Sequence, residues 1–143
     1  TDRPDDARRA FAESYKATPQ RPQYARKFAD DAAEKHAAGD LRGAAEDLGM
    51  ATLVEPDDAE FRVDLGVVLW RLRDFAGAEE QLRAALARGA PEAAVRAGLS
   101  LVLADAGDAA GAAAERDRAM AAGADDAAAA FEALEGLRGG GGT

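Results

Sequence analysis

The chain has 143 residues, of which 48% are hydrophobic, and it contains no cysteine. This length and composition suit one domain with a continuous core, and the missing cysteines exclude disulfides, thiolate metal sites and thiol catalysis. The formal net charge is -9, from 27 acidic and 18 basic residues, which disfavours nucleic-acid binding and favours neutral or basic protein partners.

Membrane and targeting signals are not evident in the sequence. The strongest candidate for a membrane span, residues 67–70, is far shorter than the roughly 18 residues that such a span needs. No signal-peptide pattern is present, so we expect no membrane insertion and a cytoplasmic location, unless an export signal has been removed. Arginine far outnumbers lysine, and Ile and Asn are absent, which indicates a GC-rich, bacterial genome.

Residues 1–24 are expected to form an N-terminal arm or half of a repeat. Phe11 and Tyr15 are four positions apart within residues 7–17, which predicts a helix, and Thr18-Pro19 ends it. Two interpretations stay open: this segment is the second helix of a truncated repeat, or it is a loose arm.

A repeat with a period of 34 residues follows the arm. Shifting the chain by this period aligns identical residues in three copies: Asp40, Asp74 and Asp108; Gly43, Gly77 and Gly111; Ala44, Ala78 and Ala112; Ala51, Ala85 and Ala119. This coincidence predicts three units, at 25–58, 59–92 and 93–126.

Each unit reads as two helices joined by a tight turn. In the second unit, apolar residues recur at helical spacing before and after a break at 73–75. In the outer units, the pairs Gly39-Asp40 and Gly107-Asp108 occupy the same break. There glycine can end one helix in the left-handed conformation, and aspartate can cap the next helix.

Residues 127–138 are predicted to form a capping helix, because a stack of repeats would otherwise expose the apolar face of its last hairpin. Ala130, Phe131, Leu134 and Leu137 form one stripe on this helix. Residues 139–143 are interpreted as a Gly-rich linker or tail.

Several of these features together resemble the tetratricopeptide repeat. They are the period, the Leu65-Gly66 pair, the small residues at Gly66, Ala78 and Ala85, and Pro56 at the end of a unit. The resemblance covers 25–126 and implies an all-α fold, an α-solenoid of three helical hairpins with a C-terminal capping helix. Small residues are needed where the two helices of a hairpin approach closely.

The outer copies depart from the pattern of the family. The first has Asp31 in place of the Leu, and the third has Arg116 where the second helix usually buries a large apolar residue. We therefore expect the third copy to be the least stable.

Signatures of catalysis are scarce. His36 is the only imidazole, Ser14 and Ser100 are the only serines, and no Gly-rich loop follows a strand. A Ser-His-Asp set would have to use His36, and His36 has no further ligands of the kind that a metal site needs. We expect no enzyme activity, no metal and no cofactor.

The resemblance implies that ligands bind along a concave groove formed by the first helices of successive hairpins. In the first unit, the inner positions are Arg26, Ala29, Ala33 and His36. The candidate partner-binding residues of the groove are Val63, Val67, Trp70, Leu101, Ala97, His36 and Arg71.

The first helix of the second unit is apolar on its open face as well as on its packing face, so something should cover it. Three occupants stay open. The first is a peptide or helix of a partner protein, anchored on Trp70. The second is the N-terminal arm, with Phe11 and Tyr15, and the third is the neighbouring turns of the chain itself.

The sequence therefore predicts a non-catalytic protein–protein interaction module that binds an extended or helical segment of a protein or peptide partner. Alternatives are a structural spacer or oligomerisation module that self-associates within a larger protein, or a chaperone-like protein for a secreted partner. Capture of a C-terminal carboxylate, a mode known in the family, is not expected. The chain contains no Asn, and Asp64 stands at the matching position, where it would repel a carboxylate.

Overall fold

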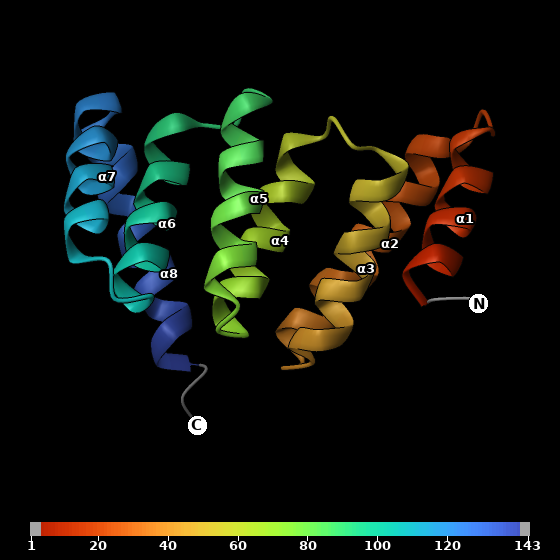
Figure 1. Cartoon of the computed structure of the whole chain (residues 1–143), viewed down its shortest axis with the longest axis horizontal. Helices are drawn as coiled ribbons and strands as arrows, with labels where there is room; N and C mark the ends of the chain where they lie inside the picture. Colours follow the sequence, from red (N-terminus) through yellow and green to blue (C-terminus); the bar gives the residue numbers. More distant parts are fainter. Residues whose placement is uncertain (1–3, 141–143) are drawn as a thin grey trace.

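The computed structural model describes residues 4–140, and these residues form helices without any strand (Figure 1). The all-α prediction is confirmed. The eight helices of this range are α1 (Pro4–Lys16), α2 (Arg21–Ala37), α3 (Leu41–Val54), α4 (Ala59–Arg71), α5 (Phe75–Ala87), α6 (Glu92–Asp105), α7 (Ala109–Ala122) and α8 (Ala124–Gly140).

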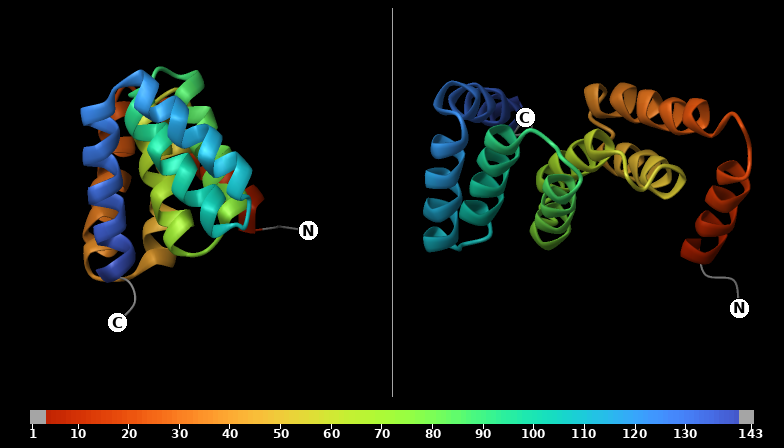
Figure 2. Two further views of the ribbon diagram at one scale, coloured as in Figure 1. Left: turned by 90° about the vertical axis from the view of Figure 1, so that its left-hand side faces the viewer. Right: turned by 90° about the horizontal axis from the view of Figure 1, so that it is seen from above.

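Three hairpins, α2–α3, α4–α5 and α6–α7, stand side by side, and each packs on the next through its second helix. The row is an α-solenoid, as the sequence predicts. In Figure 1, α2, α4 and α8 lie behind the other helices. Seen from above, the row is curved, and α2 and α8 lie on its inner side (Figure 2, right).

The second helix of each hairpin begins at the repeated aspartate: Asp40, Asp74 and Asp108. In all three, the carboxylate accepts a hydrogen bond from the backbone N–H of the glycine three residues later, at 2.9 or 3.0 Å. A Cβ on any of these glycines would collide with the capping carboxylate. The repeated aspartate and glycine are therefore two halves of one helix cap.

The residue before each cap has a positive φ, which is 86° at Gly39, 65° at Arg73 and 93° at Gly107. Glycine adopts this left-handed conformation without steric cost, whereas other residues are strained by roughly 1–2 kcal/mol. The middle turn tolerates Arg73, whose guanidinium lies 5.1 Å from the centre of the Phe75 ring.

Close approach of paired helices explains the small residues of the repeat. A Cβ at Gly66 would lie 2.8 Å from Cγ of Leu82, which is itself buried. Ala78 and Ala85 of the same hairpin are fully buried. A larger side chain at these positions would force the helices apart.

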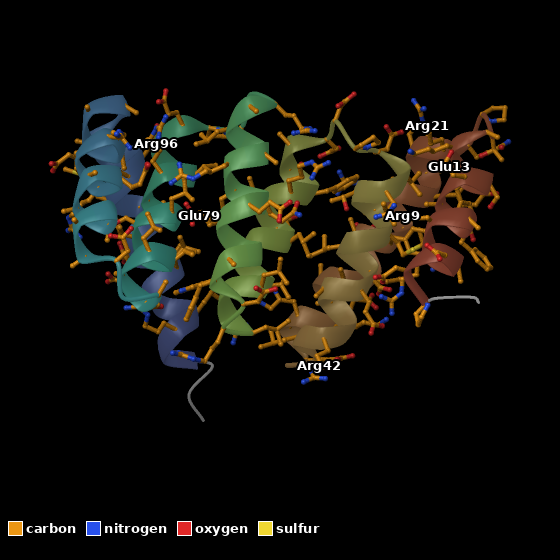
Figure 3. The ribbon with its side chains drawn as sticks, viewed as in Figure 1. Arg9, Glu13, Arg21, Arg42, Glu79 and Arg96 are labelled. Atoms are coloured by element: carbon orange, nitrogen blue, oxygen red, sulfur yellow. The ribbon has the colours of Figure 1, made fainter. Side chains whose placement is uncertain are left out.

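The third hairpin replaces an apolar contact by an ionic cluster. Arg116 is exposed and stacks on the Phe131 ring at 4.7 Å, whereas the neighbouring Glu115 is 1% exposed. Arg83, Arg96 and Arg118 lie 2.8–3.4 Å from its carboxylate (Figure 3 labels Arg96). Burial alone would raise the pKa of Glu115, but hydrogen bonds from Arg96 and Arg118 and the nearby positive charges hold it below its usual value.

The helices at the two ends of the row differ from the expected boundaries by a few residues. α2 begins at Arg21, before the expected start of the first unit at 25, and α8 begins at Ala124 and continues to Gly140. Residues 1–3 of the expected arm and 141–143 of the expected tail lie outside the described residues. In the part of the chain that the structure covers, no helix is long and apolar enough to cross a membrane.

The left-handed turn gives a test of the fold. We expect Gly107→Ala to lower the free energy of unfolding by about 1–2 kcal/mol, because alanine is strained at this φ. Gly49→Ala is the matched control: Gly49 lies inside α3 with nothing within 4 Å of its Cβ position, so alanine should raise the stability by about 1 kcal/mol. Urea unfolding curves of both variants measure this, and equal effects of the same sign would contradict the assignment.

Candidate functional site

α8 lies over the inner faces of the last two hairpins. Trp70, Ala97 and Leu101 are buried in one core cluster together with Ala127 and Phe131 of α8. Leu134 and Leu137 pack against the same cluster from further along α8. The capping helix therefore also covers much of the surface at which the sequence predicts an open groove.

Polar contacts hold the end of α8 in place. The indole N–H of Trp70 donates a hydrogen bond to the Asp105 carboxylate at 2.7 Å. Arg138 donates to both oxygens of the same carboxylate at 2.9 Å, and its guanidinium lies 5.5 Å from the centre of the Trp70 ring. This arrangement ties α8 to the C-terminal ends of α4 and α6.

The N-terminal arm does not cover Trp70. α1 packs on α3 and α2 with Ala12 buried, and the ring of Tyr15 contacts those of Tyr24 and Phe28. Phe11 is 62% exposed. Of the occupants considered for the groove, the arm is therefore wrong, and the residues that bury Trp70 belong to the chain itself, in a helix and not in neighbouring turns.

A cleft lies between α2 and α8, and residues of α4 form its floor. We call this opening the α2–α8 cleft. It has a volume of about 320 Å³. Its walls carry small or apolar side chains, and its polar groups are few; its lining is Ala29, Ala32, Ala33, His36, Leu48, Asp64, Val67, Val68, Leu134 and Leu137.

The predicted groove residues separate into two groups. Val67 and His36 line the α2–α8 cleft, and Arg71 lies beside His36 and Leu137 in the hollow that continues it. Val63 is half-buried against the core cluster. The other three, Trp70, Ala97 and Leu101, are buried beneath α8 and leave little surface to an external ligand.

Asp64 is the acidic group of the cleft. Its side chain is accessible by area, but protein surrounds it within the concave surface, and this desolvation, with the negative charge of Glu60, raises its pKa to about 6. The positive charge of Arg26 acts in the opposite direction. Arg26 contacts Glu60 at 4.0 Å, whereas Asp64 makes no ion pair or hydrogen bond with residues of the described range.

His36 lies near the end of α2, on the α2 wall of the cleft. Burial and then the positive charge of Arg71 lower the pKa of its imidazole. Its Nε2 atom is buried and has no hydrogen-bond partner among the described residues. The side chain lines the cleft, but this nitrogen is not exposed to it.

The lining holds little that could perform chemistry. It contains no hydroxyl or thiol, so His36 and Asp64 have no nucleophile beside them. Over residues 4–140, no group of three or more His, Cys, Asp or Glu side chains is placed to hold a metal ion. The arrangement suits non-covalent binding of an apolar surface.

Sequence reasoning identifies the α2 wall but misses the α8 wall. The helical phase places Ala29 and Ala33 on the inner face of the first unit, and both line the cleft. The stripe with Leu134 and Leu137 is predicted only to cap the stack. The stripe is no longer than the helices of the hairpin that it covers, so nothing in the sequence distinguishes this second role from capping.

Comparisons with known proteins agree with this fold. No protein-family model matches the chain, and no curated protein matches it either. Among solved structures, the crystal structure of MamA is similar, with a TM-score of 0.67 and 18% sequence identity over 94% of this chain and 88% of that one. MamA is a tetratricopeptide-type helical protein, so the likeness supports a fold of tetratricopeptide-like helical repeats.

The contact between Arg138 and Trp70 can be tested directly, since Trp70 is the only tryptophan. We expect Arg138→Ala to shift the tryptophan emission to longer wavelength and to lower stability by about 1 kcal/mol, as the half-exposed pair with Asp105 and the ring contact are lost. Arg42→Ala is the control, because Arg42 is exposed and points away from the body (Figure 3). Unchanged emission in Arg138→Ala would contradict the contact.

Asp64 should reduce stability at neutral pH. Its pKa is raised in the folded state, so the ionised carboxylate lowers the free energy of unfolding above pH 6. This destabilisation disappears as the pH falls toward 4. We expect Asp64→Asn to stabilise the protein at pH 7.5 by about 1 kcal/mol, which is well below the full value of the shift because solvent screens the exposed carboxylate.

Chemical denaturation of wild type and Asp64→Asn at pH 7.5 and pH 4.5 measures this difference. The two proteins should differ at pH 7.5 and converge at pH 4.5. A difference that does not depend on pH would show that the amide acts through something other than charge.

Proposed function

We propose that this chain is a non-catalytic protein–protein interaction module that binds an extended or helical segment of a partner protein in the α2–α8 cleft. The observation that carries the proposal is the cleft itself, in which Val67, Leu134 and Leu137 present apolar surface inside a concavity. Ligand sites in proteins are concave and mostly apolar, with a small number of polar groups. The likeness in fold to MamA supports a general protein-binding role for this helical repeat.

In this proposal, the predicted groove residues have two roles. Val67, His36 and Arg71 contact the partner. Trp70, Ala97 and Leu101 support α8 from below and so fix the position of one wall. The absence of a hydroxyl or thiol from the lining supports a role in binding and not in catalysis.

Filling the cleft tests the proposal. Ala33 is exposed on the α2 wall, so Ala33→Trp should block the cleft without disturbing the core. Ala113→Trp is the matched control, because Ala113 is exposed on α7, away from the cleft. We expect wild type and Ala113→Trp to capture the same protein from the source lysate, and Ala33→Trp to lose at least nine-tenths of it.

Circular dichroism first establishes that all three baits are folded. The captured protein is then purified, and its affinity for each variant is measured by calorimetry. If Ala33→Trp binds it as tightly as wild type does, the cleft is not the binding site, and a spacer or self-association role becomes the better proposal.

A further inference from the structure

The side chains of the α2–α8 cleft indicate which kind of segment fits it. The inference drawn from them rests on the proposed function. We propose that its occupant is an amphipathic helix of a partner protein, with a lysine or arginine that pairs with Asp64 and, seven residues away, an aspartate or glutamate that pairs with Arg71. The apolar residues between them contact Val67, Leu134 and Leu137.

The walls favour a helical occupant over an extended one. α2, α4 and α8 satisfy their own backbone hydrogen bonds within each helix, so the cleft offers no sheet edge to an extended peptide. The backbone N–H and C=O groups of a helix are already hydrogen-bonded within it, so a helix presents only side chains to the cleft. The cleft is therefore suited to helix-in-groove binding.

The side chains on the α2 wall indicate how a helix can approach. The small residues Ala29 and Ala33 let the axis of the partner helix come close to α2. One face of that helix then lies against the apolar side chains of Val67, Leu134 and Leu137.

The charges along α4 differ between its two ends. Near the beginning, Asp64 follows Glu60 by four residues, and Asp64 has no cation of its own within the described range. At the end of the helix stands Arg71, which also makes no ion pair or hydrogen bond with described residues. A ligand cation therefore fits beside Asp64, and a ligand anion fits beside Arg71.

The same two groups give the spacing of the charges on the partner. Asp64 and Arg71 are seven residues apart on one helix, which corresponds to about 10.5 Å along its axis. A partner helix that matches both carries its charges one heptad apart.

A display experiment tests this chemistry with peptides in place of the natural partner. A library of randomised 16-residue helical peptides is selected on wild type and counter-selected on Ala33→Trp, which leaves the peptides that need the cleft. We expect these peptides to be enriched in a basic and an acidic residue seven positions apart, with apolar residues between.

Synthetic peptides then identify the contacts by calorimetry. Changing the basic residue of a selected peptide to Glu should weaken its binding to wild type at least tenfold. Asp64→Lys should reverse this preference, so that the Glu peptide binds more tightly than the original. Asp117→Lys is the control, because Asp117 is exposed on α7, and it should leave both affinities within about twofold, as expected of an exposed charge away from the site.

The outcomes separate the two proposals. The inference is overturned if the cleft-dependent peptides show no charge preference, or if Asp64→Lys leaves their preference unchanged. Either result leaves the proposed function standing. Peptides that bind Ala33→Trp as well as wild type, or a selection with no cleft-dependent binder, would overturn the proposed function and the inference together.

Discussion

The close approach of the two helices within each hairpin is the constraint on which the rest of this structure depends. Gly66 leaves room for Leu82, and Ala78 and Ala85 leave room for the facing helix. The three hairpins, in each of which the second helix begins at an aspartate cap, then stack side by side into a curved row. The concave surface is thus a consequence of where small side chains occur in the repeat.

α8 converts that concave surface into a narrower cleft. Ala127 and Phe131, near the beginning of α8, are buried and cap the last hairpin. The later part of the helix continues over α4 and α6, where Arg138 meets Trp70 and Asp105. One helix therefore closes the end of the core and also forms a wall of the candidate site, so that binding and stability are coupled through it.

The helical hairpins could be predicted from the sequence because their signals are local and repeated. The caps at Asp40, Asp74 and Asp108 each use a partner three residues away, and the 34-residue period shows them in three copies. The course of α8 depends instead on contacts between distant positions. Arg138 and Asp105 are 33 residues apart, and nothing in the periodicity of α8 indicates this pairing.

The third hairpin shows a second limit of the pattern. Arg116 occupies the position at which an apolar side chain is expected, and the structure leaves it outside, against Phe131. The buried place beside it is taken by Glu115, whose charge is compensated by arginines from three helices. Only the folded chain brings Arg83, Arg96 and Arg118 together, so no local reading of the sequence could have found this cluster.

Glu115 and Asp64 have opposite electrostatic environments. Glu115 is the more deeply buried by area, yet its pKa is lowered, because arginines donate to its carboxylate. Asp64 is more accessible, yet its pKa is raised to about 6, because protein surrounds it and no cation pairs with it. Burial raises the pKa of both carboxyl groups, and only Glu115 has arginine donors that outweigh this effect.

Three arginines surround the buried Glu115, but no arginine lies close enough to Asp64 to form an ion pair. Arg26, the arginine near Asp64, pairs with the adjacent Glu60. An exposed acid without an ion-pair partner among the described residues, in an apolar cleft, has the features of a site completed by another molecule. The missing cation is then the one that the ligand supplies.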